Sequence, residues 1–231
     1  DCYDLNVTLD VTAGTDFGVL VQGTSLRNLI EADVTDAGHG FHLKGNLGQG
    51  LDRTWVSGSA IDCDRMVRNT TVKGDDYGAV GLVFENSTGG GVADFYARRC
   101  YAPSRDYVAD GGGLELYDAT DAVIRDVTIS ESEGGIETGG SSGKGCKRIT
   151  ITRLRLEGDL GAGTGALGQP ARSPGFLLRN LADSTVEFTA DVTRAKDVLR
   201  VEAPGNGFAG SMSGTTITGT IQSRPGVNPI A

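Results

Sequence analysis

Two glutamates, Glu115 and Glu137, are the residues of this chain whose type and spacing best suit acid–base chemistry. They hold the same position in two similar segments, GLELYD and GIETGG, which begin at residues 113 and 135. Successive side chains of a β-strand face opposite ways, so both glutamates point outward if the apolar residues beside them point inward. Two carboxylates stacked on neighbouring strands, roughly 4.8 Å apart, repel each other unless a proton, a cation or a substrate lies between them.

The two segments belong to a repeat that can be followed along almost the whole chain. One strand type has the pattern Gly-apolar-x-apolar, and its copies are predicted at 18–23, 40–45, 81–86, 113–118, 135–140 and 175–180, with a weaker copy at 197–202. A longer strand type alternates with it, at 5–11, 26–34, 54–62, 91–99, 122–130, 148–156, 184–192 and 215–221. Repeats of this length, in which each unit buries its face only against its neighbours, indicate a solenoid.

The repeat therefore predicts an all-β fold, a single-stranded right-handed parallel β-helix of about eight rungs. Asn-Gly and Asp-Gly dipeptides, which typically connect hairpins, are rare here, and this argues against a sandwich or a barrel. We expect one domain over residues 1–231, either a mature protein or a fragment of a longer chain. The first rung needs a cap that covers its open end. Three sources are considered: a cap that was removed, a cap that a partner supplies, and residues 1–11 folded over the end. The tail 222–231 is predicted to be coil.

Aligning the copies of the first strand type places its outward side chains in two columns. The first column reads Leu20, His42, Val83, Glu115, Glu137, Leu177 and Arg200, and the second reads Gln22, Lys44, Glu85, Tyr117, Gly139, Arg179 and Glu202. The candidate catalytic residues on this face are Glu115, Glu137, Tyr117, His42 and Lys44. The candidate substrate-binding residues are Glu85, Arg68, Asp110, Asp118, Arg105 and Arg179.

The repeat pattern resembles the right-handed parallel β-helix proteins of the pectate-lyase-like superfamily, over nearly the whole chain. The resemblance implies a carbohydrate-active enzyme whose partner is a polysaccharide or an oligosaccharide, bound on the outer face. It rests on no catalytic motif. Gly38-His39-Gly40 resembles the GHG of polygalacturonases, but the paired aspartates that precede GHG in that family follow it here. We interpret the segment as a turn into the strand at 40–45.

Two mechanisms fit the outward residues, and the sequence leaves both open. A glycoside hydrolase or transglycosylase needs one protonated and one ionised carboxyl, which Glu115 and Glu137 supply. A lyase or epimerase acting on a uronate needs a base, from Lys44, Arg68 or Tyr117, and a cation to neutralise the sugar carboxylate. In that case Glu115 and Glu137 would hold Ca²⁺, the one cofactor considered. The alternative function is a non-catalytic sugar-binding, adhesive or virus tailspike-type module.

Composition limits the other classes of function. The net charge of −9 argues against a nucleic-acid binder. The sequence contains no apolar run long enough to cross a membrane, so no membrane insertion is expected.

The four cysteines, at 2, 63, 100 and 146, contain no close pair that suggests zinc, and they permit disulfides or buried positions in the solenoid. Three Asn-x-Ser/Thr sequons favour a secreted or cell-surface protein. The sequence permits a homo-oligomer and does not decide between a monomer and an oligomer.

Overall fold

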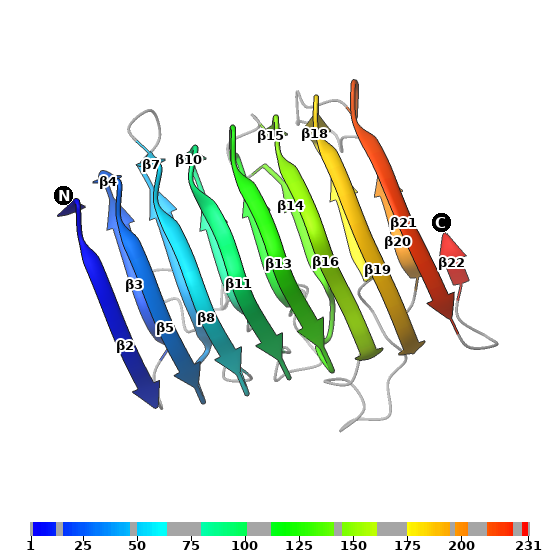
Figure 1. Cartoon of the computed structure of the whole chain (residues 1–231), viewed down its shortest axis with the longest axis horizontal. Coiled ribbons are helices and arrows are strands. Elements are labelled where there is room, and N and C mark those ends of the chain that lie inside the picture. The colour runs from blue at the N-terminus through cyan, green and yellow to red at the C-terminus, as the bar shows by residue number, and fades with distance from the viewer. Residues whose placement is uncertain are drawn as a thin grey trace, which may run out of the picture.

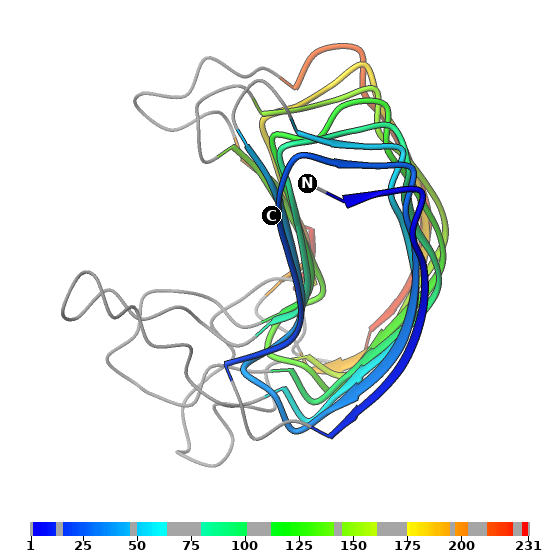
Figure 2. The same cartoon turned by 90° about the vertical axis from the view of Figure 1, so that its left-hand side faces the viewer.

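The computed structural model describes residues 2–12, 16–46, 50–63, 80–100, 112–140, 145–160, 175–194, 197–202, 212–223 and 228–230. Every regular element in these segments is a β-strand, and neighbouring strands pair in parallel. The strands lie side by side in chain order along the molecule (Figure 1), and successive turns of the chain superpose around a common interior (Figure 2). The predicted all-β parallel solenoid is therefore confirmed.

Two eight-stranded parallel sheets form the walls of the solenoid. Sheet 1 contains β2 (Asn6–Thr12), β5 (Leu29–Thr35), β8 (Trp55–Ile61), β11 (Gly91–Arg98), β13 (Val123–Ser130), β16 (Thr150–Asp159), β19 (Thr185–Arg194) and β21 (Thr216–Ser223). Sheet 2 contains β3 (Phe17–Gly23), β6 (His39–Gly45), β9 (Val80–Glu85), β12 (Gly112–Tyr117), β14 (Ile136–Gly139), β17 (Phe176–Arg179), β20 (Asp197–Glu202) and β22 (Asn228–Ile230). One strand of each sheet makes one rung, which agrees with the predicted eight rungs.

Short strands form a third wall between the two sheets. They are β1 (Cys2–Tyr3), β4 (Ser25–Leu26), β7 (Leu51–Asp52), β10 (Ser87–Thr88), β15 (Cys146–Lys147) and β18 (Leu181–Ala182). Parallel bridges through Thr120 connect β10 to β15. The predicted strand at 26–34 therefore consists of part of β4, a corner and most of β5.

Two expectations about the ends of the chain were wrong. The tail was predicted to be coil, but its residues 228–230 form β22, which pairs with β20 and completes the eighth rung. Residues 1–11 were one option for an end cap, but β1 and β2 pair with β4 and β5 and form the first rung itself. Leu9 consequently lies in register with the buried Ala32, yet is 42% exposed because no rung covers it.

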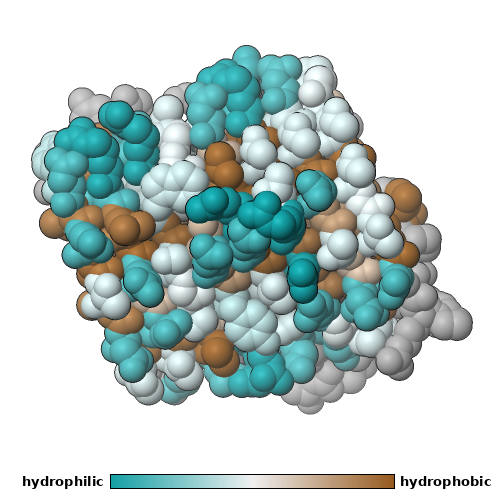
Figure 3. All heavy atoms as spheres, viewed as in Figure 1, coloured by the Kyte–Doolittle hydropathy of each residue, from teal (hydrophilic) through white to brown (hydrophobic). Residues whose placement is uncertain are grey.

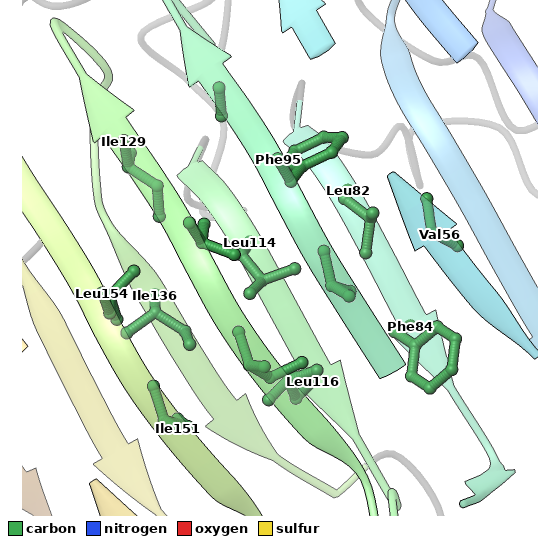
Figure 4. Close-up of a cluster of buried hydrophobic side chains, with 14 of the residues drawn as sticks. Val56, Leu82, Phe84, Phe95, Leu114, Leu116, Ile129, Ile136, Ile151 and Leu154 are labelled. Carbon is green, nitrogen blue, oxygen red and sulfur yellow. The ribbon is translucent and has the colours of Figure 1, made fainter. Parts of the chain in front are cut away.

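The apolar side chains that alternate along both sheets fill the interior. Leu82, Phe84, Leu114 and Leu116 of sheet 2 are fully buried. Figure 4 shows them beside side chains of sheet 1 such as Phe95. Burying a side chain of this size contributes roughly 1.5–3 kcal/mol. This shared core fixes the strand positions, and with them the outward side chains. In the same view as Figure 1, hydrophilic residues on the outer face of sheet 1 are interspersed with residues of intermediate hydropathy and with hydrophobic ones (Figure 3).

A glycine lies at or near the start of β3, β6, β9, β12, β14 and β17 of sheet 2, and close packing explains it. A Cβ atom added to Gly81 would lie 2.6 Å from the carbonyl oxygen of Gly113 and 3.0 Å from the Cβ of Ala97. A Cβ added to Gly113 would lie 2.4 Å from a side-chain carbon of Ile129. The pattern Gly-apolar-x-apolar thus marks the points where the two sheets approach too closely for any side chain.

A column of left-handed residues turns the chain before every strand of sheet 1. All eight members have positive φ angles: Asp4, Arg27, Arg53, Gly89, Asp121, Arg148, Asp183 and Gly214. Such angles are uncommon outside glycine, asparagine and aspartate. Charges of opposite sign pair along the column, with the Arg27 Nε 2.6 Å from a carboxylate oxygen of Asp4. The structure therefore assigns these charged residues to the corner and not to the candidate site.

Candidate functional site

The outer face of sheet 2 carries the predicted site, and strand pairing confirms the predicted register. Glu115 on β12 pairs directly with Glu137 on β14. Strand pairing also places the rest of the first column in the predicted order, from Leu20 on β3 to Arg200 on β20. The second column follows from Gln22 to Tyr117, and Arg179 pairs with Glu202.

The first column is an apolar stripe that two carboxylates interrupt. Val83 precedes Glu115 in the ladder and is 3% exposed, and Leu177 follows Glu137 and is 7% exposed. The stripe continues through His42 to Leu20. Although these side chains point away from the core, most are shielded from water. The acid pair thus lies in a surface that is apolar on both sides along the solenoid axis.

Glu137 accepts hydrogen bonds from two residues of the second column. The guanidinium of Arg179 donates to Oε1 of Glu137, and the hydroxyl of Tyr117 donates to the same oxygen at 3.1 Å. Only 12% of the Glu137 side chain is exposed. Charge-assisted hydrogen bonds of this kind favour the carboxylate over the carboxylic acid.

Tyr117 serves this site as a hydrogen-bond donor. Burial, together with the negative charges of Glu115 and Glu137, raises the pKa of Tyr117 well above its ordinary value. The phenol therefore keeps its proton at neutral pH. This removes Tyr117 from the candidate bases considered for a lyase and leaves it positioned to orient Glu137.

A second cluster surrounds Glu85, whose side chain is 8% exposed. The Nζ of Lys44 lies 3.1 Å from Oε2 of Glu85, and the Nδ2 of Asn86 donates to its Oε1 at 3.3 Å. The Nε2 of His42 is 4.0 Å from Oε2, too far for a hydrogen bond. Burial lowers the pKa of His42 to about 4, against the opposing attraction of Glu85. The imidazole is therefore neutral at physiological pH.

Three residues near this face were missed by the sequence reasoning. His39 belongs to β6, and not to a preceding turn, and its ring stacks on that of His42 with centroids 5.3 Å apart. Phe17 packs against both imidazoles. Asp197, 5% exposed, pairs with Arg200. The signal for His39 was the glycine between the two histidines: Gly40 approaches the core so closely that the alternation of side chains breaks there.

Among the remaining predicted residues, the structure describes only Asp118, which does not join the cluster. Asp118 lies at the corner after β12, has a φ of 50° and accepts a hydrogen bond from the backbone N–H of Gly145 at 2.8 Å. Its carboxylate supports that corner. Arg68, Asp110 and Arg105 lie outside the described residues.

The described residues do not fit the Ca²⁺ site that the sequence left open. Ca²⁺ takes six to eight oxygen ligands. Within the described segments, no group of three or more histidine, cysteine, aspartate or glutamate side chains is arranged to hold a metal ion. Glu137, one of the two expected ligands, already receives hydrogen bonds from Arg179 and Tyr117.

No protein-family model and no curated protein matches this sequence. Among the described residues, no helix is long and apolar enough to cross a membrane. The function must therefore be argued from the chemistry of the outer face of sheet 2.

Proposed function

We propose that this protein is a carbohydrate-active enzyme of the pectate-lyase-like β-helix superfamily. It cleaves a neutral polysaccharide on the outer face of sheet 2, as a glycoside hydrolase or transglycosylase. The observation that carries the proposal is the in-register pair of Glu115 and Glu137, in which one member accepts hydrogen bonds from Arg179 and Tyr117. Two carboxyl groups in different protonation states are what glycosidic bond cleavage requires.

The contacts of the pair support a division of the two roles. Glu137, which accepts from Arg179 and Tyr117, is the ionised group that acts as nucleophile or as base towards water. Glu115 is then the acid, and its proton goes to the glycosidic oxygen as the bond from that oxygen to the anomeric carbon breaks. The strand spacing of about 4.8 Å is close to the roughly 5–5.5 Å carboxyl separation of retaining enzymes. We therefore expect retention of anomeric configuration.

The charges of this face favour a neutral substrate over a uronate. A lyase or epimerase needs positive charge to neutralise the carboxylate of the sugar. The two outward columns contain three cations, and each is paired with a carboxylate of the protein: Lys44 with Glu85, Arg179 with Glu137, and Arg200 with Asp197. Binding a uronate here would break one of these pairs. A neutral sugar would instead place its apolar C–H surfaces on the first column and its hydroxyls beside the polar second column.

The test is a product assay with polysaccharides of both charge classes. The neutral class is represented by xylan, mannan, galactan and β-glucan, and the uronate class by polygalacturonate and alginate. We expect release of reducing ends from a neutral member, without the absorbance near 235 nm that marks a lyase product. Glu115→Gln and Glu137→Gln should each lower the rate by at least about a hundredfold. Glu31→Gln, which alters an exposed glutamate of sheet 1, is the matched control and should leave the rate unchanged.

Three results would contradict the proposal. Cleavage of a uronate with absorbance near 235 nm would make the protein a lyase. Cleavage that survives both glutamine substitutions would place the reaction elsewhere on the molecule. Binding of a polysaccharide without turnover, unaffected by either substitution, would identify a non-catalytic sugar-binding, adhesive or tailspike-type module.

A further inference from the structure

An uncharged surface lies on the same face as the acid pair, towards the N-terminal end of the solenoid. The rings of Phe17 and His42 meet edge to face, with centroids 5.4 Å apart. Leu20 pairs with His42 in the ladder and is 46% exposed. Aromatic and aliphatic side chains of this kind typically line sites that bind small organic ligands.

We infer that Phe17, Leu20 and His42 form a binding subsite for a sugar unit remote from the bond that is cleaved. This inference rests on the proposed function and specifies how its substrate is held. His42 lies two strands from Glu115 and Leu20 lies three, which correspond to about 10 Å and about 14 Å at the usual strand spacing. A single sugar cannot bridge that span. The substrate is therefore an oligomer that runs across the strands, along the solenoid axis.

The column between the subsite and the acid pair is continuous and suited to a neutral chain. Val83 stands between His42 and Glu115 and adds an apolar surface. The imidazole of His42 is neutral, since burial lowers its pKa, and a neutral imidazole has one donor and one acceptor nitrogen. Neither nitrogen hydrogen bonds to the described residues. Both nitrogens are buried, so the exposed 15% of the His42 side chain is carbon and adds to the uncharged surface.

Leu20→Ser tests the subsite, with Leu29→Ser as the matched control. Leu29 is 48% exposed, but it lies on β5 of sheet 1. The probes are the neutral polysaccharides of the panel above and their di- to hexasaccharides. We expect Leu20→Ser to raise KM for the longest oligosaccharides by about threefold to tenfold, to leave kcat unchanged, and to leave KM for the disaccharide unchanged. Leu29→Ser should change none of these constants.

The outcomes separate this inference from the proposed function. Cleavage with identical constants for Leu20→Ser and wild type at every length would overturn the subsite and leave the enzyme proposal standing. Binding without cleavage, weakened by Leu20→Ser and not by Leu29→Ser, would support the subsite and overturn the enzyme. If none of the neutral probes is cleaved or bound, both are wrong.

Cys63 and Cys100 provide a second, independent observation. Both are fully buried, and each follows a left-handed corner residue, Asp62 or Arg99. Ile61 pairs with Arg98 in the sheet 1 ladder, so the two cysteines occupy equivalent positions on adjacent rungs. Both are free thiols in this structure, and the neighbouring Cys63 raises the pKa of Cys100.

We propose that Cys63 and Cys100 are oxidised to a disulfide that joins the third and fourth rungs. Equivalent residues of adjacent strands are separated by about 4.8 Å, within the 4.4–6.8 Å between Cα atoms that disulfides require. A low-molecular-weight disulfide such as oxidised glutathione is the oxidant: its S–S bond is reduced to two thiols as the two cysteine thiols lose their hydrogens and bond to each other. The bond forms during folding, before the thiols are buried.

The position of this disulfide connects it to the candidate site. Cys63 follows β8 and precedes β9 in the chain, and Cys100 follows β11 and precedes β12. These two strands carry Glu85 and Glu115. A disulfide between Cys63 and Cys100 would covalently join two adjacent rungs. One of these rungs carries Glu85, and the other carries Glu115.

The experiment is refolding of the Cys2→Ser protein in a buffer of oxidised and reduced glutathione, followed by thiol counting in denaturant and peptide mapping. We expect one free thiol, at Cys146, and a peptide in which Cys63 is joined to Cys100. Dithiothreitol should lower the thermal midpoint by about 5–10 °C in this protein and leave it unchanged when Cys63→Ser and Cys100→Ser are added. Three free thiols after refolding, or a different pairing, would overturn the proposal.

Discussion

His42 should make the stability of this protein depend on pH in a direction that the structure fixes. Its folded pKa is about 4 against an ordinary 6.5, because burial disfavours the imidazolium. Between these values the unfolded chain binds a proton that the folded chain does not, so stability falls as pH falls. A pKa difference of about 2.5 corresponds to about 3 kcal/mol in full, and to about 2 kcal/mol between pH 7.5 and pH 5.

Urea unfolding of the wild type and of His42→Phe at several pH values measures this effect. Phenylalanine keeps an aromatic ring beside Phe17 but does not titrate. We expect the stability of wild type relative to the variant to fall by about 2 kcal/mol from pH 7.5 to pH 5. Carboxylates titrate in both proteins and largely cancel in this difference.

Nuclear magnetic resonance supplies the direct check on the pKa. The chain has two histidines, so the signal lost in His42→Phe belongs to His42 and the other belongs to His39. A midpoint for His42 near 6.5, or a stability difference that stays constant within about 0.5 kcal/mol over this pH range, would refute the argument from burial. Glu85→Gln should lower the midpoint further, because the carboxylate near Nε2 favours the charged form.

Three further predictions follow from the packing and the site. Gly81→Ala should cost about 1–3 kcal/mol in urea unfolding, because its new Cβ meets backbone and core atoms. Gly112→Ala, whose Cβ would have no neighbour closer than 3.7 Å, should be neutral or stabilising; equal costs would contradict the packing explanation. Arg148→Gly should leave the urea midpoint unchanged, because glycine suits its φ of 53° while only an exposed ion pair is lost; a clear loss of stability would show that the pair matters. Tyr117→Phe should cost about 1 kcal/mol by removing a donor to Glu137. In a pH titration followed by absorbance near 295 nm, the wild type should show one tyrosine that ionises only when the protein unfolds. The Tyr117→Phe variant should lack this tyrosine.

The fold could be predicted from the sequence because the sequence repeat of a solenoid indicates the register of its strands. Each Gly-apolar-x-apolar copy shows which of its residues point outward, so the pairing of Glu115 with Glu137 could be predicted from the sequence. The partners of Glu137 were less predictable. Arg179 comes from the next rung, 42 residues along the chain, and nothing local indicates that its guanidinium turns towards Oε1. The burial of His42 could not be predicted either, because a side chain that points outward from a strand is usually exposed to solvent.

The last strand of sheet 2 was missed because it is short. Residues 228–230 contain a proline and follow another, and proline ordinarily argues against a strand. The pairing of β22 with β20 shows why the rule fails here. In the described structure, β22 is the last strand of sheet 2, and a proline in an edge strand sacrifices no hydrogen bond on its open side.

Two groups of charged residues in the solenoid have different physical origins. Corner residues such as Asp121 and Arg148 have positive φ angles and pair in exposed ladders, so the turns account for them. Outward residues of sheet 2 such as Glu85 and Glu137 have no such explanation, since strands do not require acids and burying them is costly unless they are paired. The fold supplies partners for both, from neighbouring strands. Partly buried, paired acids at outward strand positions are therefore a feature that the solenoid itself does not need, and this supports our proposal that the outer face of sheet 2 is the functional surface.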